Sequence, residues 1–174
     1  IFELRIIGDG SLLEEFKKYS SELNLRSISF LGRLKDVQLE MRDFDVMVVP
    51  SIREPLGNVI VEAALYKVPL IASRVDGIVE IIDHNYSGIL LIPSLPVDSR
   101  FVSDNVPLPE YVVDVEKKKL MQPMQLDPNE LAEAITFLNS NSSVASEFSE
   151  RLHKKVVEKF HIDKYSKKVR QLYE

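Results

Sequence analysis

The segment that most constrains the fold spans residues 45–72. Its first apolar run, residues 46–49, ends at Pro50, and a second run, residues 70–72, follows a segment rich in alanine and valine. The order strand, turn, helix, strand is typical of a parallel βαβ unit with a right-handed crossover. Because ligands of open parallel sheets bind beyond the carboxyl ends of the strands, we expect residues 51–58 to line a binding site.

Strands and helices alternate along most of the remaining chain. Ser11 and Glu14 have the spacing of a capping box at the start of the first helix. The pattern as a whole predicts a doubly wound parallel sheet of the α/β class with C-terminal helices. Apolar runs and helical periodicity predict further strands at residues 2–7, 28–31 and 89–92, and helices at residues 11–24, 36–42, 78–83, 129–139, 143–160 and 163–173.

The length of the chain suggests a simple domain organisation. A chain of 174 residues can bury a core of its own, so we expect a single domain, residues 1–174. Five prolines lie within residues 93–125, and we interpret this segment as a surface insertion without regular structure, apart from an edge strand at residues 111–115. Because the first residue is Ile1 and a strand begins at once, we expect the chain to be a fragment of a two-domain protein.

Composition argues against several classes of function. A formal charge of −5 leaves no basic surface to neutralise phosphates, so we expect no nucleic-acid partner. The chain has no cysteine, which excludes disulfides and thiolate metal sites and fits a reducing compartment. No apolar run reaches the roughly 20 residues that a membrane-spanning helix needs, and no signal-peptide pattern is present. We therefore expect a cytoplasmic location.

Gly57 stands where the turn after residue 50 meets the helix. The backbone N–H groups of Gly57, Asn58 and Val59 lie at the start of that helix, where no intrahelical acceptor is available. Together with the helix dipole they can bind an anion, and glycine also lets a ligand approach the backbone closely. The alternative is that Gly57 only eases a tight turn.

Two glutamates, eight residues apart, flank this turn. Glu62 lies among apolar residues of the helix, and a buried carboxylate needs a partner, such as the two hydroxyls of a ribose. The alternative for Glu62 is a solvated side chain on a narrow exposed stripe. Glu54, in the turn, would repel a bound phosphate unless it faced a group rich in hydroxyls. An anion site between two diol-binding acids describes a nucleotide diphosphate sugar.

Residues 50–63 read Pro-Ser-Ile-Arg-Glu-Pro-Leu-Gly-Asn-Val-Ile-Val-Glu-Ala, with seven residues between the two glutamates. This motif resembles the signature of the retaining, nucleotide-sugar-dependent glycosyltransferases of the GT-B fold, the glycosyl transferases group 1 family. The likeness covers residues 2–92 and resumes after Pro128. Shorter segments resemble that family in the same order, namely residues 6–10, 30–32, 76–82 and 88–91.

The resemblance implies that the chain is the Rossmann-like, donor-binding half of a GT-B fold. Glu54 would contact the donor sugar and stabilise the transition state, and Glu62 would hold the ribose hydroxyls. The donor would be a UDP- or GDP-linked sugar, with no cofactor and no metal ion. Its sugar and diphosphate would bind at Ser51, Leu56, Gly57, Asn58 and Val59. Its base and ribose would bind in a pocket lined by Gly8, Gly10, Arg33 and Leu34.

The resemblance also implies the activity of the full-length protein. It would transfer a hexose-type sugar to a glycan, a lipid or a small acceptor in polysaccharide or envelope biosynthesis, and it could associate peripherally with the membrane surface. The N-terminal acceptor-binding domain of the family is missing from this sequence, together with an Arg and a Lys that usually contact the diphosphate. We therefore expect the isolated chain to be inactive.

The chain departs from the family pattern in three places. Asp76-Gly77 stands where two glycines are usual, Leu56 stands where phenylalanine is common, and the insertion is long. Two alternative functions remain open at this point: a sugar-nucleotide epimerase of the same architecture, and a non-catalytic binding module with this fold.

Overall fold

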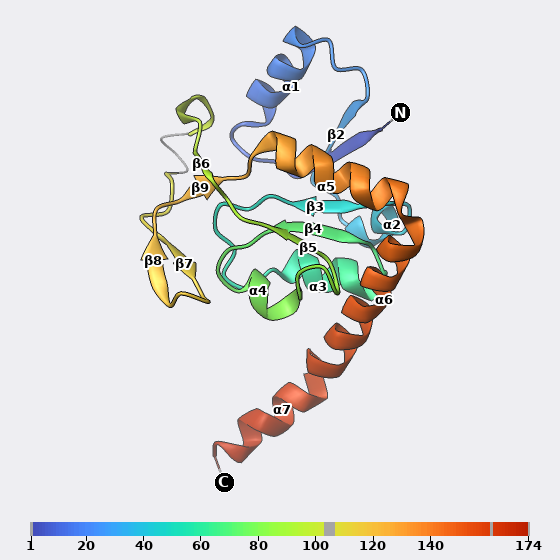
Figure 1. The fold of residues 1–174 in the computed structure, drawn as a ribbon, viewed down its shortest axis with the longest axis vertical. Coiled ribbons are helices and arrows are strands. Elements are labelled where there is room, and N and C mark those ends of the chain that lie inside the picture. Colours follow the sequence, from blue (N-terminus) through green and yellow to red (C-terminus); the bar gives the residue numbers. More distant parts are fainter. Residues whose placement is uncertain (1, 103–106, 161, 174) are drawn as a thin grey trace. The chain divides into compact units, whose positions relative to one another are not determined.

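The structure, a computed structural model, describes residues 2–102, 107–160 and 162–173 (Figure 1). These residues form two units. The smaller unit comprises the described residues of 1–37 and 98–108, and the larger unit comprises those of 38–97 and 109–174. Helix α2 (Val37–Met41) stands where the chain passes from one unit to the other. None of the helices in the described ranges has the length and apolar character needed to cross a membrane.

The smaller unit is built on two parallel strands, β1 (Leu4–Ile7) and β2 (Ile28–Gly32). Helix α1 (Leu13–Glu22) connects them, and a short 3₁₀ helix, η1 (Ser99–Phe101), belongs to the same unit. The predicted strands and helix are confirmed, but the predicted capping box is wrong. Leu13 N–H bonds to Gly10 C=O in a turn, so the N-cap is Leu12, which makes no side-chain cap.

The larger unit contains a three-stranded parallel sheet in the order β3 (Met47–Val49), β4 (Leu70–Ser73) and β5 (Ile89–Leu91). Helix α3 (Asn58–Leu65) connects β3 to β4, and helix α4 (Ile78–Ile81) connects β4 to β5. All four residues of the central strand β4 are buried. The predicted βαβ unit is therefore confirmed, and the continuous apolar run at residues 70–72 reflects a strand that is covered on both faces.

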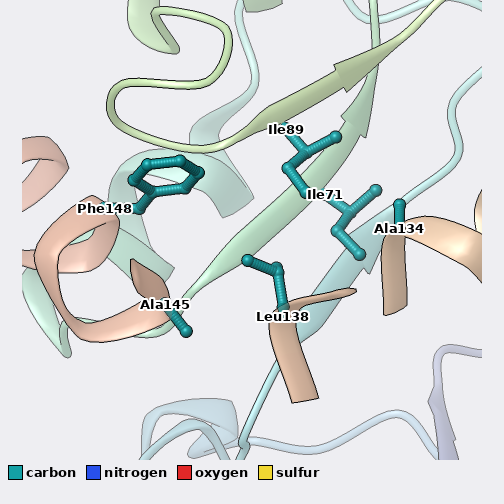
Figure 2. Packing of buried hydrophobic residues seen from close by; sticks show 6 residues of the cluster. All are labelled: Ile71, Ile89, Ala134, Leu138, Ala145 and Phe148. Carbon is teal, nitrogen blue, oxygen red and sulfur yellow. The ribbon is translucent and has the colours of Figure 1, made fainter. Parts of the chain in front are cut away.

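Three C-terminal helices follow: α5 (Pro128–Ser140), α6 (Ser142–Lys159) and α7 (Ile162–Gln171). Asp127 caps α5 by accepting the Asn129 N–H at 2.8 Å. Helix α5 packs on β4 and β5, whereas α3 and α4 lie on the other face of the sheet, and α6 contacts α3, α4 and α5 (Figure 1). The core between the sheet and these helices is apolar, as Figure 2 shows for Ile71, Ile89, Ala134, Leu138, Ala145 and Phe148.

The insertion contains more regular structure than the sequence suggested. Strand β6 (Leu95–Pro96) pairs with β9 (Met124–Gln125), and β7 (Val112–Asp114) pairs with β8 (Lys119–Met121), both antiparallel. The predicted edge strand is confirmed, and the prediction of an otherwise structureless segment is wrong for these residues. Short strands without apolar runs escape a periodicity analysis. Residues 103–106 of the insertion lie outside the described residues.

A histidine side chain bonds to the backbone of β5. His84 Nδ1 accepts the Leu90 N–H at 3.0 Å, so this nitrogen carries no proton. Burial of part of the imidazole, and then the positive charge of Arg74, lower the pKa of His84 below its usual 6.5. Protonation would therefore break a bond to the middle residue of β5.

We expect the free energy of unfolding to decrease as the pH falls below about 6.5. In that range the unfolded chain takes up a proton at His84 while the folded chain does not, because its pKa is lowered. The variant His84→Asn keeps an acceptor atom but does not titrate, so its stability should fall less. Urea unfolding of both proteins between about pH 7.5 and 5.5 measures this difference. Equal pH dependence of the two proteins would contradict the assignment.

Candidate functional site

The loop between β3 and α3, residues 50–57, is held at the carboxyl ends of two neighbouring strands. The Glu54 N–H donates to Asp76 Oδ2 at 3.0 Å, and the Gly77 N–H donates to the Glu54 carbonyl oxygen at 3.3 Å. Asp76 and Gly77 follow β4. The loop after β3 is therefore bonded, through the N–H and the C=O of Glu54, to the loop after β4. This is the edge of the sheet at which the sequence predicts a binding site.

Gly57 lies at the N-cap of α3 in the left-handed conformation, with φ +82°. A Cβ atom at this position would lie 3.0 Å from Ile60 Cδ1. The turn therefore favours glycine at this position, in agreement with one of the two interpretations of this residue. The Gly57 N–H donates to Glu54 Oε1 at 3.0 Å. The first of the three backbone donors expected to face an anion is thus bonded to Glu54 instead.

The next two donors at this helix end have no protein acceptor. Within the described ranges, nothing accepts a hydrogen bond from the N–H of Asn58 or Val59, whereas the N–H groups of Ile60 and Val61 bond to Gly57 C=O. Asn58 is exposed and Val59 is half-buried. Two backbone donors at the positive end of a helix dipole are therefore available to an anion.

Glu62 lies on α3 and is half-buried. Its helix neighbours Ile60, Ala63 and Ala64 are buried, as the apolar sequence predicted. In the part of the chain that the structure describes, the Glu62 carboxylate has no hydrogen-bond or ion-pair partner. Because the side chain is half-exposed, water can solvate it, so a solvated stripe and a diol-binding role both fit this position.

The remaining predicted residues divide between the two units. Ser51, half-buried, and Leu56, exposed, lie in the loop of the larger unit. The other four belong to the smaller unit, where they follow its two parallel strands. There the Gly8 N–H bonds to Gly32 C=O at 2.8 Å, and Gly8 has φ +143°. The roles of all of these residues stay predictions; the four in the smaller unit are Gly8, Gly10, Arg33 and Leu34.

Sequence reasoning missed the role of Asp76. Its side chain is 7% exposed, its φ is +42°, and both of its carboxylate oxygens accept backbone N–H groups. Asp76 appeared in the sequence only as a departure from a two-glycine pattern. An acidic residue at a position that favours glycine was nevertheless a signal, because aspartate is among the few residues that tolerate positive φ and can bond to nearby backbone.

The larger unit also has two open hollows away from this loop. One, of about 280 Å³, lies at the amino ends of β3 and β4, where Asp45 and Lys67 contribute to its lining. The other, of about 420 Å³, lies against β7 and β8. Neither is lined by a predicted site residue. Within the described ranges, no group of three or more His, Asp and Glu side chains could hold a metal ion.

Comparisons with known proteins place the chain among glycosyltransferases. Residues 1–99 match the family model of glycosyl transferases group 1. An uncharacterized glycosyltransferase from Methanocaldococcus jannaschii is 31% identical over 132 residues, which cover 72% of this chain and 34% of that protein. The Escherichia coli UDP-Gal:alpha-D-GlcNAc-diphosphoundecaprenol alpha-1,3-galactosyltransferase is 31% identical over 88 residues, covering 49% of this chain and 23% of that protein.

A solved structure confirms the fold. Anabaena Alr3699/HepE, determined in complex with UDP and glucose, matches with a TM-score of 0.75 at 19% identity, covering 98% of this chain and 40% of that one. At this identity the likeness concerns the fold alone, which is the α/β half of a GT-B protein, as predicted. The aligned segments span about a third of the length of the first two curated relatives.

The close packing of Gly77 against the loop leads to a prediction on stability. A Cβ atom at this position would collide with the Pro55 carbonyl oxygen and lie 3.2 Å from Leu56 Cα, both of them backbone atoms that cannot rotate away. We expect Gly77→Ala to lower the free energy of unfolding by about 1–3 kcal/mol because the loop must move. Urea unfolding monitored by circular dichroism gives this value.

Gly10→Ala is the control for this measurement. Gly10 has no atom within 4 Å of an added Cβ and no positive φ. Its substitution should change the free energy of unfolding by less than about 0.5 kcal/mol. If Gly77→Ala proved as stable as Gly10→Ala, the loop would not be packed as described.

Proposed function

Because the chain belongs to the glycosyl transferases group 1 family, we propose that its larger unit binds the sugar and diphosphate of a UDP- or GDP-linked sugar at the loop between β3 and α3. The observation that carries this proposal is the pair of backbone donors at Asn58 and Val59, which lack an acceptor among the described residues and lie between Glu54 and Glu62 in the chain. A phosphate oxygen matches these donors and the dipole of α3.

Glu54 is held in a defined orientation for the sugar. Its Oε1 accepts the Gly57 N–H at 3.0 Å, while no protein group within the described ranges donates to Oε2. The second oxygen is therefore free to accept a hydroxyl hydrogen of the donor sugar. Fixing one carboxylate oxygen reduces the rotamer freedom that binding would otherwise have to restrict. In this role Glu54 contacts the sugar and stabilises the positive charge that develops on it.

Glu62 supplies the second carboxylate of the proposal. Its two oxygens can accept hydrogen bonds from the 2′- and 3′-hydroxyls of a ribose, which would supply partners that the described residues do not provide. For the smaller unit by itself, we propose contacts to a nucleotide base at Gly8, Gly10, Arg33 and Leu34, as the family resemblance implies. We propose no metal ion or cofactor for this scheme, in which the N–H groups of Asn58 and Val59 contact phosphate oxygens.

The activity of the whole protein is a further part of the proposal. We infer a retaining transfer of a hexose-type sugar to a glycan, lipid or small acceptor in polysaccharide or envelope biosynthesis, since relatives include a galactosyltransferase that acts on a diphosphoundecaprenol-linked sugar. In a retaining transfer, the oxygen of the leaving phosphate takes the proton of the attacking hydroxyl on the same face of the sugar. The acceptor would bind to a separate N-terminal domain, so the isolated chain should bind the donor without turning it over.

Isothermal titration calorimetry with UDP-glucose and GDP-mannose tests the proposal. We expect one of them to bind, and we expect Glu62→Ala to weaken that binding at least about tenfold, because a hydrogen bond to a charged group contributes about 1.5–3 kcal/mol. The matched control is Glu80→Ala, which removes an exposed glutamate from the neighbouring helix α4. It should bind as the unmodified chain does.

Two outcomes would count against this proposal. Absence of heat with every nucleotide sugar tested would contradict donor binding altogether and favour a non-catalytic module. Unchanged affinity in Glu62→Ala, with the circular dichroism spectrum of the unmodified chain, would remove the diol role of Glu62 alone.

A further inference from the structure

The hairpin formed by β7 and β8, together with the residues that flank it, contacts both loops at the proposed donor site. Three contacts join it to them. Val113 bonds to Asp76, the Arg53 guanidinium lies over the Tyr111 ring at 5.6 Å from its centre, and Arg74 forms an ion pair with Glu116. Arg53 precedes Glu54, and Arg74 and Asp76 follow β4. The hairpin is therefore attached to the loops at the carboxyl ends of β3 and β4.

The carboxylate of Asp76 is the link between the hairpin and the Glu54 loop. Its Oδ1 accepts the Val113 N–H at 2.8 Å, and its Oδ2 accepts the Glu54 N–H at 3.0 Å. The Asp76 N–H in turn donates to the Val113 carbonyl oxygen at 3.2 Å. The Asp76 carboxylate thus bonds, with both of its oxygens, to the backbone of two segments that lie far apart in the sequence. We call this pair of hydrogen bonds the bridge.

This arrangement carries a conformational cost that glycine would avoid. Asp76 has φ +42° and is 7% exposed, so the chain places a charged residue in a left-handed conformation at a nearly buried position. Glycine would adopt this conformation without strain but would leave both N–H groups without their acceptor. The bonds to a carboxylate are charge-assisted and stronger than neutral ones. The bridge therefore explains an aspartate at this position.

We propose that Asp76 is a positioning residue for the donor site and that the β7–β8 hairpin is a functional part of that site, because together they hold the Glu54 backbone where its side chain can meet the sugar. This inference rests on the proposed function. It assigns the β7–β8 hairpin to donor binding, and it implies linkage in both directions. A donor that fixes the Glu54 loop must also stabilise the bonded hairpin.

Two substitutions of Asp76 remove different numbers of the bridge's hydrogen bonds. Asp76→Gly keeps the positive φ without strain and removes both acceptors. Asp76→Asn retains one acceptor oxygen, but its amide nitrogen faces the other backbone N–H, so one bond is lost. The matched control is Asn85→Gly, which relieves a positive φ of +56° at an exposed position before β5, outside the hairpin and the two loops of the donor site.

Amide hydrogen exchange followed by NMR measures the bridge directly. In Asp76→Gly we expect the amides of Glu54 and Val113 to exchange at least about tenfold faster, and in Asp76→Asn only one of them. Amides of the buried strand β4 should stay protected, which shows that the sheet is intact. Asn85→Gly should leave the exchange of both bridge amides unchanged. Unchanged exchange at both amides in Asp76→Gly would overturn the bridge.

Calorimetry with the same nucleotide sugar tests the positioning role. We expect Asp76→Gly to bind about tenfold more weakly and Asn85→Gly to bind normally. Added nucleotide sugar should slow exchange at Val113 in the unmodified chain but not in Asp76→Gly, an effect that a purely structural residue would not produce. Normal affinity in Asp76→Gly overturns the inference and leaves the proposed function standing. Absence of binding by the unmodified chain overturns the proposed function. The hydrogen-exchange experiment then still tests whether the bridge exists.

Discussion

The backbone of the Glu54 loop is bonded to the segment that follows β4, and the rest of the candidate site depends on this attachment. The Glu54 N–H meets the Asp76 carboxylate, and the Gly77 N–H meets the Glu54 carbonyl. These two bonds fix the loop through the N–H and the C=O of Glu54. Gly57 then begins α3 in a left-handed conformation. That start places the N–H groups of Asn58 and Val59 at the open end of the helix.

The apolar core keeps the two attached loops at the same edge of the sheet. Strand β4 is fully buried, and its Ile71 packs with Ile89 of β5 and with Leu138 of α5 (Figure 2). Helix α6 contacts α3 and α4, the helices that begin at these loops. This burial fixes where the strands end, and the positions of the strand ends determine where the following loops begin. Polar bonds such as those of Asp76 then decide the local conformation.

Much of this architecture could be predicted because it follows from local patterns. The apolar runs at residues 46–49 and 70–72, with a glycine before the helix between them, suffice to identify a βαβ unit and the strand ends at which ligands bind. The carboxylate of Glu62 on an apolar helix was likewise visible in the sequence.

What the sequence could not reveal are bonds between segments distant in the chain and choices between competing local ones. Glu54 bonds to the Gly57 N–H, which removes a donor that helix geometry alone would leave open. Asp76 bonds to Val113, thirty-seven residues away, through a hairpin too short to show periodicity. Ser11 has the spacing of a cap, yet a turn from Gly10 to Leu13 moves the helix start beyond it.

We propose that the N-terminal end of α3 and the Glu54 loop bind a nucleotide sugar. An NMR titration of the ¹⁵N-labelled chain with UDP-glucose tests it most directly, because each backbone amide reports its own surroundings. We expect the largest chemical-shift changes at the amides of Glu54, Asn58 and Val59. Changes confined to the opposite end of the sheet, around Asp45 and Lys67, would contradict it.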